Sequence, residues 1–482
     1  MNNRIIQYVC ISLFATILSG CAVVGPDYKR PSAPQSPPFK EAKGWQKATP
    51  LDQETKGAWW KVYQDPVLSK LLAQVQINNQ NVAEYTAQYE KAKAVAEQAG
   101  ANLYPSISGS ASSTRSGTQS QTSNSFSAKG SASWELDLWG KLRRTREEDR
   151  ASAMASAAQL ANATLSAQSS LAQDYFQLRV MDEQIALYQR NIKNYTQYLK
   201  VVNNQYKAGN ISRSSLAQAQ TQLHTTQVSM INLKWQRAQY EHAIAVLIGK
   251  PPAAFSLPAE PLTYHLPTIP AELPSALLQR RPDIAYAERN VAAANAAVGV
   301  AIAGYYPDLT LSASAGVENS TLSNLFELPS RVWSIGPSLS GNIFDFGATK
   351  AKVRQAKASY DASVANYRQT VLNAFQEVED YLVAIHGLNE EMTVQKQATA
   401  SARESARVTY NQFNSGMIDY LNVATTEATS LSQQQNELNI IKSQLINSVK
   451  LIVALGGGWN VSDLPSATPP KKTKSTTEKV TP

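Results

Sequence analysis

The sequence is poor in cysteine and in charge. Its 482 residues include only two cysteines, Cys10 and Cys21, and charged residues make up 17% of the chain, against roughly 25% in soluble domains. Cys10 lies in an apolar leading segment that we expect to be removed, so the mature chain can form no internal disulfide. Because small secreted domains usually depend on disulfides, we expect this chain to be stabilised by packing and assembly instead.

Residue clusters that carry catalysis are missing as well. No nucleophile motif, glycine-rich phosphate loop or HExxH pattern is present. The four histidines lie far apart in the chain: His224, His242, His265 and His386. The formal net charge is +8, but the basic residues are scattered and are not interleaved with aromatics, as nucleic-acid binding requires. We therefore expect no enzyme activity, no metal site, no cofactor and no nucleic-acid partner.

Residues 1–20 resemble a lipoprotein signal peptide. Arg4 supplies the positive start, residues 5–18 form an apolar run, and small residues precede Cys21. The run is too short to span a bilayer, which takes about 20 residues. The resemblance implies cleavage before Cys21, a covalent lipid on its sulfur, and sorting to the outer membrane, because Ala22 rather than Asp follows. The alternative is an ordinary secretory signal in which Cys21 has no role.

The chain contains an internal duplication. Three short stretches recur 207 residues later, and a Tyr-Pro pair recurs 202 residues later. The pairs are residues 136–140 (LDLWG) with 343–347 (IFDFG), 206–209 (YKAG) with 413–416 (FNSG), 247–249 with 454–456, and Tyr104-Pro105 with Tyr306-Pro307. In each copy a helical stretch, residues 68–102 or 275–303, leads to the Tyr-Pro pair. Two strand-like segments, a very long helix, a glycine turn and another helix follow.

The duplication divides the chain into segments. We expect a signal peptide (1–20), a lipid-anchored N-terminal segment (21–60), a first repeat (61–250), a proline-rich linker (251–274), a second repeat (275–459) and a disordered C-terminal tail (460–482). The tail prediction depends on its content of Pro, Thr, Ser and Lys.

Four segments show the strict alternation of a β-strand. We expect strands over residues 106–113, 126–138, 309–317 and 333–343, although Pro337 argues against a regular last strand. In residues 126–138 the even-numbered positions are apolar or glycine and the odd-numbered ones are polar. A transmembrane barrel turns apolar residues to lipid and polar residues to a wet lumen. The alternative is a soluble β-sandwich, but an isolated hairpin is barely stable in water.

The helices set the length of the molecule. Between Gly140 and Gly209 lie 68 residues without glycine or proline, and a continuous helix there would extend about 100 Å. The matching stretch between Gly347 and Gly416 contains only Gly387. A fibrous coiled coil is one alternative. Small-residue runs without a strict heptad seam favour helices with neighbours on two sides, as in a hollow cylinder.

Four strands cannot close a membrane barrel, because single-chain barrels begin at about eight strands. Several copies of the chain must then share one barrel, and a closed ring is the usual symmetry of identical subunits. The alternation alone does not set the number of copies.

Motifs along most of the chain resemble those of the TolC-like outer-membrane factors. Within that family the chain is similar to the NodT-type lipoprotein branch, which serves RND and related tripartite efflux systems. The resemblance runs from residue 18 to residue 459. It is carried by residues 25–31 (GPDYKRP), Trp59-Trp60, residues 65–68 (DPVL), residues 280–284 (RRPDI), Ala287-Glu288, the Tyr-Pro and Phe-Asp-Phe-Gly elements, and residues 454–459 (ALGGGW).

The resemblance implies a mixed fold and a passive transport function. Three subunits would each give four strands to one transmembrane β-barrel, which continues into a long α-helical periplasmic barrel. The homotrimer would conduct drugs or other toxic compounds outward from an inner-membrane RND or related transporter and a periplasmic adaptor, the membrane fusion protein. It would be lipid-anchored in the outer membrane. The alternative is a trimeric coiled-coil spacer or adhesin without a pore, which would not explain the repeated hairpin.

The resemblance also implies a gate at the inner end of the helices. Gly209 and Gly416 would form the periplasmic turn tips, and Leu421 corresponds to an apolar constriction. The other expected gate residues are Asp419, Phe413, Tyr410 and Gln412. The family often has Asp four residues after the constriction, where this chain has Thr425. The alternative is that Leu421 only packs between helices.

Overall fold

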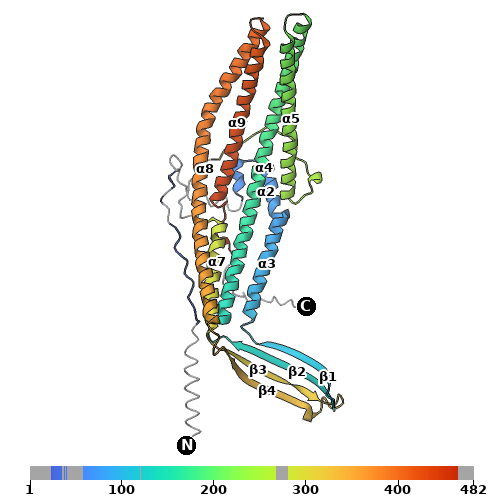
Figure 1. Ribbon diagram of the computed structural model, residues 1–482, viewed down its shortest axis with the longest axis vertical. Helices are drawn as coiled ribbons and strands as arrows, with labels where there is room; N and C mark the ends of the chain where they lie inside the picture. The colour runs from blue at the N-terminus through green and yellow to red at the C-terminus, as the bar shows by residue number, and fades with distance from the viewer. Residues whose placement is uncertain are drawn as a thin grey trace, which may run out of the picture.

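The computed structural model describes residues 23–34, 37, 39–40, 58–119, 121–267 and 280–464. The signal peptide, Cys21, the predicted helix start at residue 275 and residues 465–482 lie outside the described residues. The molecule is a long bundle of helices with one β-sheet at its end (Figure 1). Among the described residues, no helix has the length and apolar character needed to cross a membrane.

Two helical hairpins of equal dimensions form the body. The first joins α4 (Lys141–Lys207) to α5 (Arg213–Leu247), and the second joins α8 (Ala348–Asn414) to α9 (Tyr420–Ala454). In each hairpin the long helix has 67 residues, or about 100 Å, and the return helix has 35. The predicted long helices are therefore confirmed, and α8 runs through Gly387 without a break. Both hairpin turns lie at the end farthest from the sheet (Figure 1).

The predicted helical stretch over residues 68–102 is present, but it is divided into two helices. The structure has α2 (Pro66–Asn78) and α3 (Gln80–Ala101), separated by Asn79 in an extended conformation. The Asn79 side chain accepts a hydrogen bond from Val82 N at 3.1 Å and donates one to the carbonyl of Leu247 at 2.8 Å. Asparagine is a strong N-cap residue, so it starts a new helix here while tying it to the end of α5.

A four-stranded antiparallel sheet follows the order of the chain: β1 (Ser106–Gly117), β2 (Thr122–Leu136), β3 (Asp308–Asn319) and β4 (Arg331–Ser340). The four predicted strands are present with shifted ends. Pro337 lies inside β4, contrary to the prediction that it disfavours a regular strand. In the single chain β4 is an edge strand, and one side of an edge strand needs no backbone donor.

The strand register puts the alternation of all four strands in phase. Residues directly opposite each other point to the same face of a sheet. One such row consists of Ile107, Ala132, Ala313 and Ile335. The adjacent row consists of Ser106, Ser133, Ser312 and Gly336. The sheet therefore has one apolar and one polar face, as the alternation predicts.

The largest core cluster lies midway along the body, where α2, α4, α5 and α9 meet. It contains the aromatic pair Trp59-Trp60 of the short helix η3 (Trp59–Tyr63) together with Leu72, Tyr175 and Leu445. The two tryptophans of the family resemblance are thus packing residues that close the bundle at its waist.

Each long helix starts from a strand through a glycine in the left-handed region. Gly140 has φ 79° and Gly347 has φ 89°, values that glycine adopts without steric cost. The Asp137 carboxylate accepts hydrogen bonds from Leu142 N and Arg143 N, both at 3.0 Å. In the second repeat Asp345 accepts from Thr349 N at 2.8 Å. The recurring aromatic-glycine element is therefore a helix start.

The N-terminal strap, defined as the described residues between 23 and 40, runs along the outside of the helices (Figure 1). It begins at the junction of sheet and helices, where Val24 N donates to the carbonyl of Trp139 at 3.0 Å. The buried Arg144 guanidinium donates to the carbonyls of Val24 and Gly25, both at 3.2 Å, and to Asp27 at 2.8 Å. These contacts fix the start of the strap at the base of the sheet.

Gly456 and Gly416, which follow the ends of α9 and α8, allow a test of how tightly each helix end is packed. Gly456, at the end of α9, has φ 102°, and a Cβ there would lie 2.1 Å from the carbonyl oxygen of Arg280. Gly416 also has a positive φ, 70°, but faces open space. Alanine at either position stores backbone strain of about 1–3 kcal/mol. We expect Gly456→Ala to lower the midpoint of thermal unfolding, followed by far-UV circular dichroism, clearly more than Gly416→Ala, and equal midpoints would contradict this.

Candidate functional site

The two hairpin tips are built alike. Gly209 N donates to the carbonyl of Tyr206 and Gly416 N to that of Phe413, both at 2.9 Å. In each turn the N–H of the residue after the glycine donates to the carbonyl five residues before it, Asn210 to Gln205 and Met417 to Gln412. This pair of bonds caps the long helix as a Schellman motif does. The positive φ of both glycines, 77° and 70°, explains their choice. The structure places both residues in turns; their role as periplasmic tips stays a prediction.

An aromatic cluster holds the two hairpins together near their tips. The tip cluster consists of Tyr195, Tyr198, Val202, Ala219, Leu223, Phe413, Tyr420 and Val423, from all four helices of the hairpins. The Tyr198 ring lies 4.9 Å from that of Tyr410. Phe413, which was expected at the gate, is buried in this cluster against Tyr420, so its side chain stabilises the tips from inside.

One carboxylate takes part in the junction of the hairpins. The Tyr198 hydroxyl donates to Glu427 of α9 at 2.8 Å. Burial raises the pKa of the Glu427 carboxyl, and the hydrogen bond from Tyr198 partly offsets this. A raised carboxyl pKa favours the protonated form, so its contribution to stability is complete below the unfolded pKa and is lost as pH rises through the raised value. Sequence reasoning missed this pair, although the helical spacing of Tyr195, Tyr198 and Val202 signals a packed stripe.

Two of the expected gate residues are exposed at the start of α9. Leu421 is 55% exposed, and Asp419 occupies the N-cap position without making a capping hydrogen bond. Tyr410 and Gln412 are half-buried on the last turns of α8. Thr425, where the family often has Asp, is neutral, and its hydroxyl donates to the carbonyl of Leu421 at 2.9 Å.

The duplication shows that the second tip has diverged from the first. The positions equivalent to Asp419 and Leu421 are Ser212 and Ser214 in the first repeat. Ser212 caps α5 by accepting from Ser215 N at 3.3 Å. Where the first tip has two serines, the second tip therefore has an apolar side chain and a carboxylate that makes no capping hydrogen bond. Such a change is unnecessary for the turn itself and points to a role of the exposed surface.

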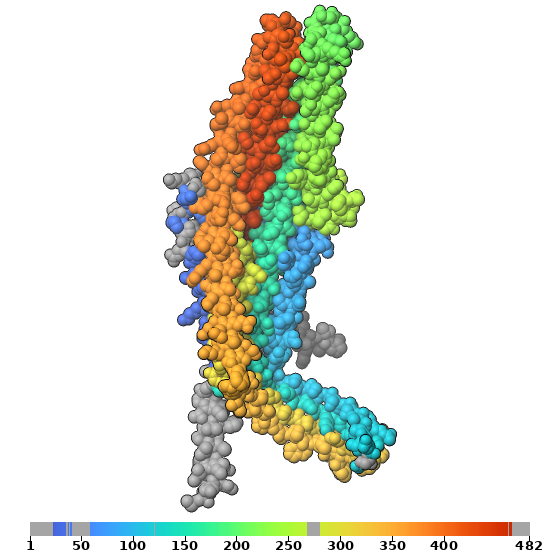
Figure 2. Space-filling model, in the orientation of Figure 1, coloured from blue at the N-terminus to red at the C-terminus, as the bar shows by residue number. Residues whose placement is uncertain are grey.

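Leu421 also lines a groove between α5 and α9. These two helices run side by side in the half of the molecule near the tips (Figure 2). The other lining side chains are small or polar, including Ala217, Thr221, Ala424 and Ala428. Within one chain, then, Leu421 is not enclosed between helices, and the alternative packing role would need a neighbouring chain.

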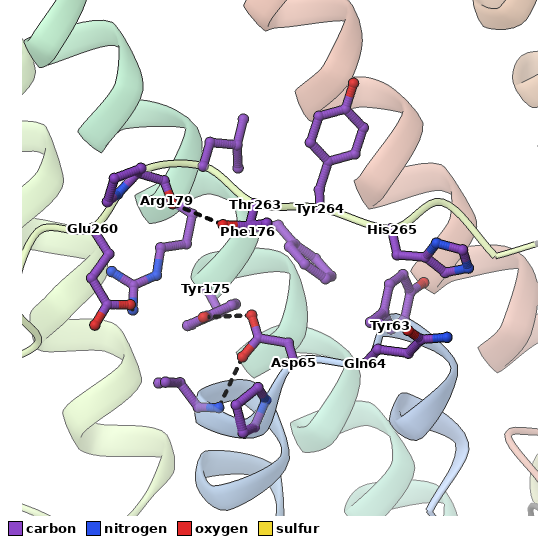
Figure 3. A pocket seen from close by; sticks show the side chains of 14 residues that line it. Tyr63, Gln64, Asp65, Tyr175, Phe176, Arg179, Glu260, Thr263, Tyr264 and His265 are labelled. Carbon is purple, nitrogen blue, oxygen red and sulfur yellow. Dashed lines mark hydrogen bonds and ion pairs between the residues drawn. The ribbon is translucent and has the colours of Figure 1, made fainter.

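A separate depression of about 360 Å³ lies at the waist of the bundle (Figure 3). Its charged walls are already paired. Asp65 caps α2 and accepts from the Tyr175 hydroxyl at 2.7 Å. Arg179 donates to Glu260 at 2.9 Å and to the carbonyl of Pro258 at 2.8 Å. These bonds hold the segment after α5 against α4, so we assign the depression a structural role.

The Arg-Arg-Pro-Asp-Ile stretch is structural as well. The buried Arg281 guanidinium forms two hydrogen bonds to Asp283, at 2.6 and 3.0 Å, and one to Glu377 at 2.8 Å. It also donates to the carbonyl of Ala454 at 3.1 Å, which closes the end of α9. In the part of the chain that the structure describes, no group of three or more His, Cys, Asp or Glu side chains is arranged to hold a metal ion.

Comparison with known proteins agrees with this architecture. The family model described as outer membrane efflux protein matches residues 71–250 and 273–457, close to the two repeats. The cation efflux system protein CusC of Escherichia coli O6:H1 is 29% identical over 456 residues, which cover 93% of this chain and 98% of CusC. The toluene efflux pump outer membrane protein TtgC of Pseudomonas putida is 28% identical over 467 residues, covering 93% and 95%.

Solved structures share the fold. The open state of the Neisseria gonorrhoeae MtrE outer membrane channel superposes with a TM-score of 0.82 at 28% identity, covering 91% of this chain and 98% of MtrE. The long helical hairpins joined to a short sheet are therefore the architecture of an outer-membrane channel.

Leu421 provides a test of the gate. If a ring of Leu421 side chains excludes water from a pore, Leu421→Ser should raise single-channel conductance in a planar bilayer, because a polar ring no longer dewets the constriction. Ile231→Ser is the matched control, since Ile231 is 60% exposed on α5 away from the tips. A stable assembly of the Leu421 variant with wild-type conductance would remove this residue from the gate.

Proposed function

The chain belongs to the outer membrane efflux protein family, and we propose that three copies form one channel that is gated at its helical tips. It is an outer-membrane efflux channel, and its relatives are transport proteins rather than enzymes. The finer points of this proposal are the trimer, the lipid on Cys21, the gate residues and the partners.

The sheet is the observation that supports a ring of several copies, and the number three comes from the resemblance to the TolC-like outer-membrane factors. It has one apolar face, one polar face and two open edges, β1 and β4. Three copies bring twelve strands, enough to close a barrel with its apolar face toward lipid. The polar face is rich in serine and would line a water-filled lumen. The helices that leave the sheet would continue the same ring as a tube.

The partners follow from the family. We propose that the tips meet a periplasmic adaptor and an inner-membrane transporter, of the RND or a related class, which loads the duct. CusC is named for cation efflux and TtgC for toluene efflux. Relatives of similar identity thus serve unlike compounds, which supports selection by the transporter and passive conduction of small molecules by this chain.

The rival proposal is a trimeric spacer or adhesin without a pore. The two differ in one measurement, because only a channel carries ions across a bilayer. Purified wild-type protein reconstituted into a planar bilayer should give discrete conductance steps. A correctly folded trimer that never conducts, even with Leu421→Ser, would favour the spacer.

Cys21 is the proposed anchor. The N-terminal strap starts at Val23, two residues after Cys21, and Val23 lies beside Gly140 at the base of the sheet. This position supports an anchor at the level where the barrel would meet the inner leaflet. We expect Cys21→Ser to abolish incorporation of labelled palmitate, because the thioether can form only on that sulfur. The variant should still assemble, since the barrel has its own apolar surface. Unchanged labelling would refute the anchor.

The lipid-facing side of the sheet gives a second test. Ala132 lies in the apolar row of the register, and Ser133 lies in the polar row. An arginine turned toward hydrocarbon costs about 2–4 kcal/mol near the bilayer midplane. We expect Ala132→Arg to reduce the yield of membrane-inserted trimer much more than Ser133→Arg, whose side chain would enter the lumen. Equal yields on native gels would contradict the assignment of the faces.

A further inference from the structure

The two repeats of one chain already form an interface with each other. β2 of the first repeat pairs with β3 of the second, with Leu136 opposite Leu309. Just beyond the strands the Trp139 ring stacks on Tyr306 at a centroid distance of 4.6 Å. Trp139 Nε1 also donates to the carbonyl of Pro307 at 2.9 Å. The end of one hairpin thus meets the start of the next.

The sequence offsets between the repeats hold in the sheet. In the first hairpin Ser106 lies opposite Ser133. Shifting the first residue by 202 and the second by 207 gives Asp308 and Ser340, and these lie opposite each other in the second hairpin. The offset of 202 therefore relates β1 to β3, and the offset of 207 relates β2 to β4.

The same offsets hold at the helix ends. Asn79 donates from its side chain to the carbonyl of Leu247 at 2.8 Å. Its equivalent Arg281 donates from its side chain to the carbonyl of Ala454 at 3.1 Å. Each pair is again related by 202 and 207. The equivalence is thus structural and extends from the sheet to the waist of the bundle.

The same offsets can be applied to the pairing of β2 with β3. They convert it into a pairing of β4 with β1, which one chain cannot make because these strands lie at opposite edges of its sheet. Leu136 opposite Leu309 becomes Ile343, three residues beyond the end of β4, opposite Ile107 near the start of β1. These strands form the two outer edges of the sheet (Figure 1). β4 can therefore meet β1 in this register only when the β1 belongs to another copy.

The aromatic contact at the junction has the same kind of counterpart. Trp139 corresponds to Phe346, and Tyr306 corresponds to Tyr104. Trp139 is half-buried, whereas Phe346 is 92% and Tyr104 is 72% exposed. Phe346 also has φ 53°, a region that bulky residues rarely occupy. An exposed aromatic ring held in such a conformation points to a missing contact.

The helices show the same missing neighbour. α3 has 2 buried residues among 22, whereas its equivalent α7 (Pro282–Ala303), packed between α4 and α8, has 12 among 22. α8 has 12 buried residues among 67, and its equivalent α4 has 23. Within one chain, α3 and α8 therefore lack the contact that α7 and α4 make with each other.

We infer that β4 of one copy pairs antiparallel with β1 of the next, with Leu339 opposite Ala111, and that Phe346 stacks on Tyr104 of the next copy. This register follows from Ile343 opposite Ile107. Because the strands are antiparallel, four residues back from Ile343 is Leu339, and four residues forward from Ile107 is Ala111. Leu339 and Ala111 both lie on the apolar face, so the pairing keeps the faces in phase. The inference rests on the proposed trimer and adds its register and contact residues.

The chemistry of the two junctions differs. Within the chain Lys141 pairs with Asp308 at 2.9 Å, and Trp139 has its N–H bond. The equivalents of the ion pair are Ala348 and Ser106, and Phe346 has no N–H. The junction between copies would therefore lack the ion pair and the indole hydrogen bond that are present at the junction within the chain.

Paired cysteines test the register in the full-length chain. Opposite residues of antiparallel strands have Cα atoms about 4.5–5.5 Å apart, within reach of a disulfide. We expect Leu339→Cys with Ala111→Cys to give covalent dimers and trimers after mild oxidation, and thiols should reverse them. Leu339→Cys with Ser113→Cys is the control, because a shift of two residues moves the Cα atoms to roughly 8 Å. Each single variant controls for Cys21.

The outcomes separate this inference from the trimer itself. Cross-linking of the Ser113 pair in place of the Ala111 pair would overturn the register. Native trimers without a cross-link in either pair would overturn this interface and leave the proposed function intact. Absence of trimers from wild-type protein as well would overturn both.

The aromatic contact has its own test. Phe346→Ala and Tyr104→Ala should each lower the temperature at which the trimer dissociates, and the double variant should lose little more than either single one, as coupled neighbours do. Phe326→Ala is the control, because Phe326 is as exposed but lies in the β3–β4 loop. Additive losses from Phe346 and Tyr104 would overturn the stacking.

Discussion

Backbone hydrogen bonding in hydrocarbon is the constraint on which the rest of the structure depends. A membrane-spanning strand must have its N–H and C=O groups paired, yet β1 and β4 each leave one side open in a single chain. In the proposed trimer these open sides become paired when the copies close the sheet into a ring. Because α4 and α8 start directly after β2 and β4, closure of the sheet would also bring the helices together as a tube.

The duplication uses the same arrangement of strands and helices twice, and the two repeats differ at a few positions. Asn79 and Arg281 do the same capping work with different side chains. At the tips the repeats diverge in a way that capping does not require, because Ser212 caps its helix and Asp419 does not. Leu421 and Asp419 thus stand out against the serines of the first repeat.

The regular parts of the fold are predictable from the sequence, because their signals are local. Alternation identifies the strands, and the long stretch without glycine or proline identifies α4. The features that the sequence does not reveal depend on contacts between distant residues. The break at Asn79 depends on a carbonyl at the end of α5, Pro337 is tolerated because of the strand order, and the burial of Phe413 depends on four helices meeting. The bond between Arg144 and Asp27 has no local signal at all.

The fixed start of the N-terminal strap has a mechanical consequence. Two peptide units separate Cys21 from Val23, so a lipidated Cys21 would be connected to the fixed Val23 by a linker of at most about 7 Å. With so little slack, the acyl chains would hold the base of the sheet at one height in the bilayer. The long helices would then set a fixed distance of about 100 Å between the base of the sheet and the tips. Helix length, rather than any adjustable tether, would set how far the tips reach across the periplasm.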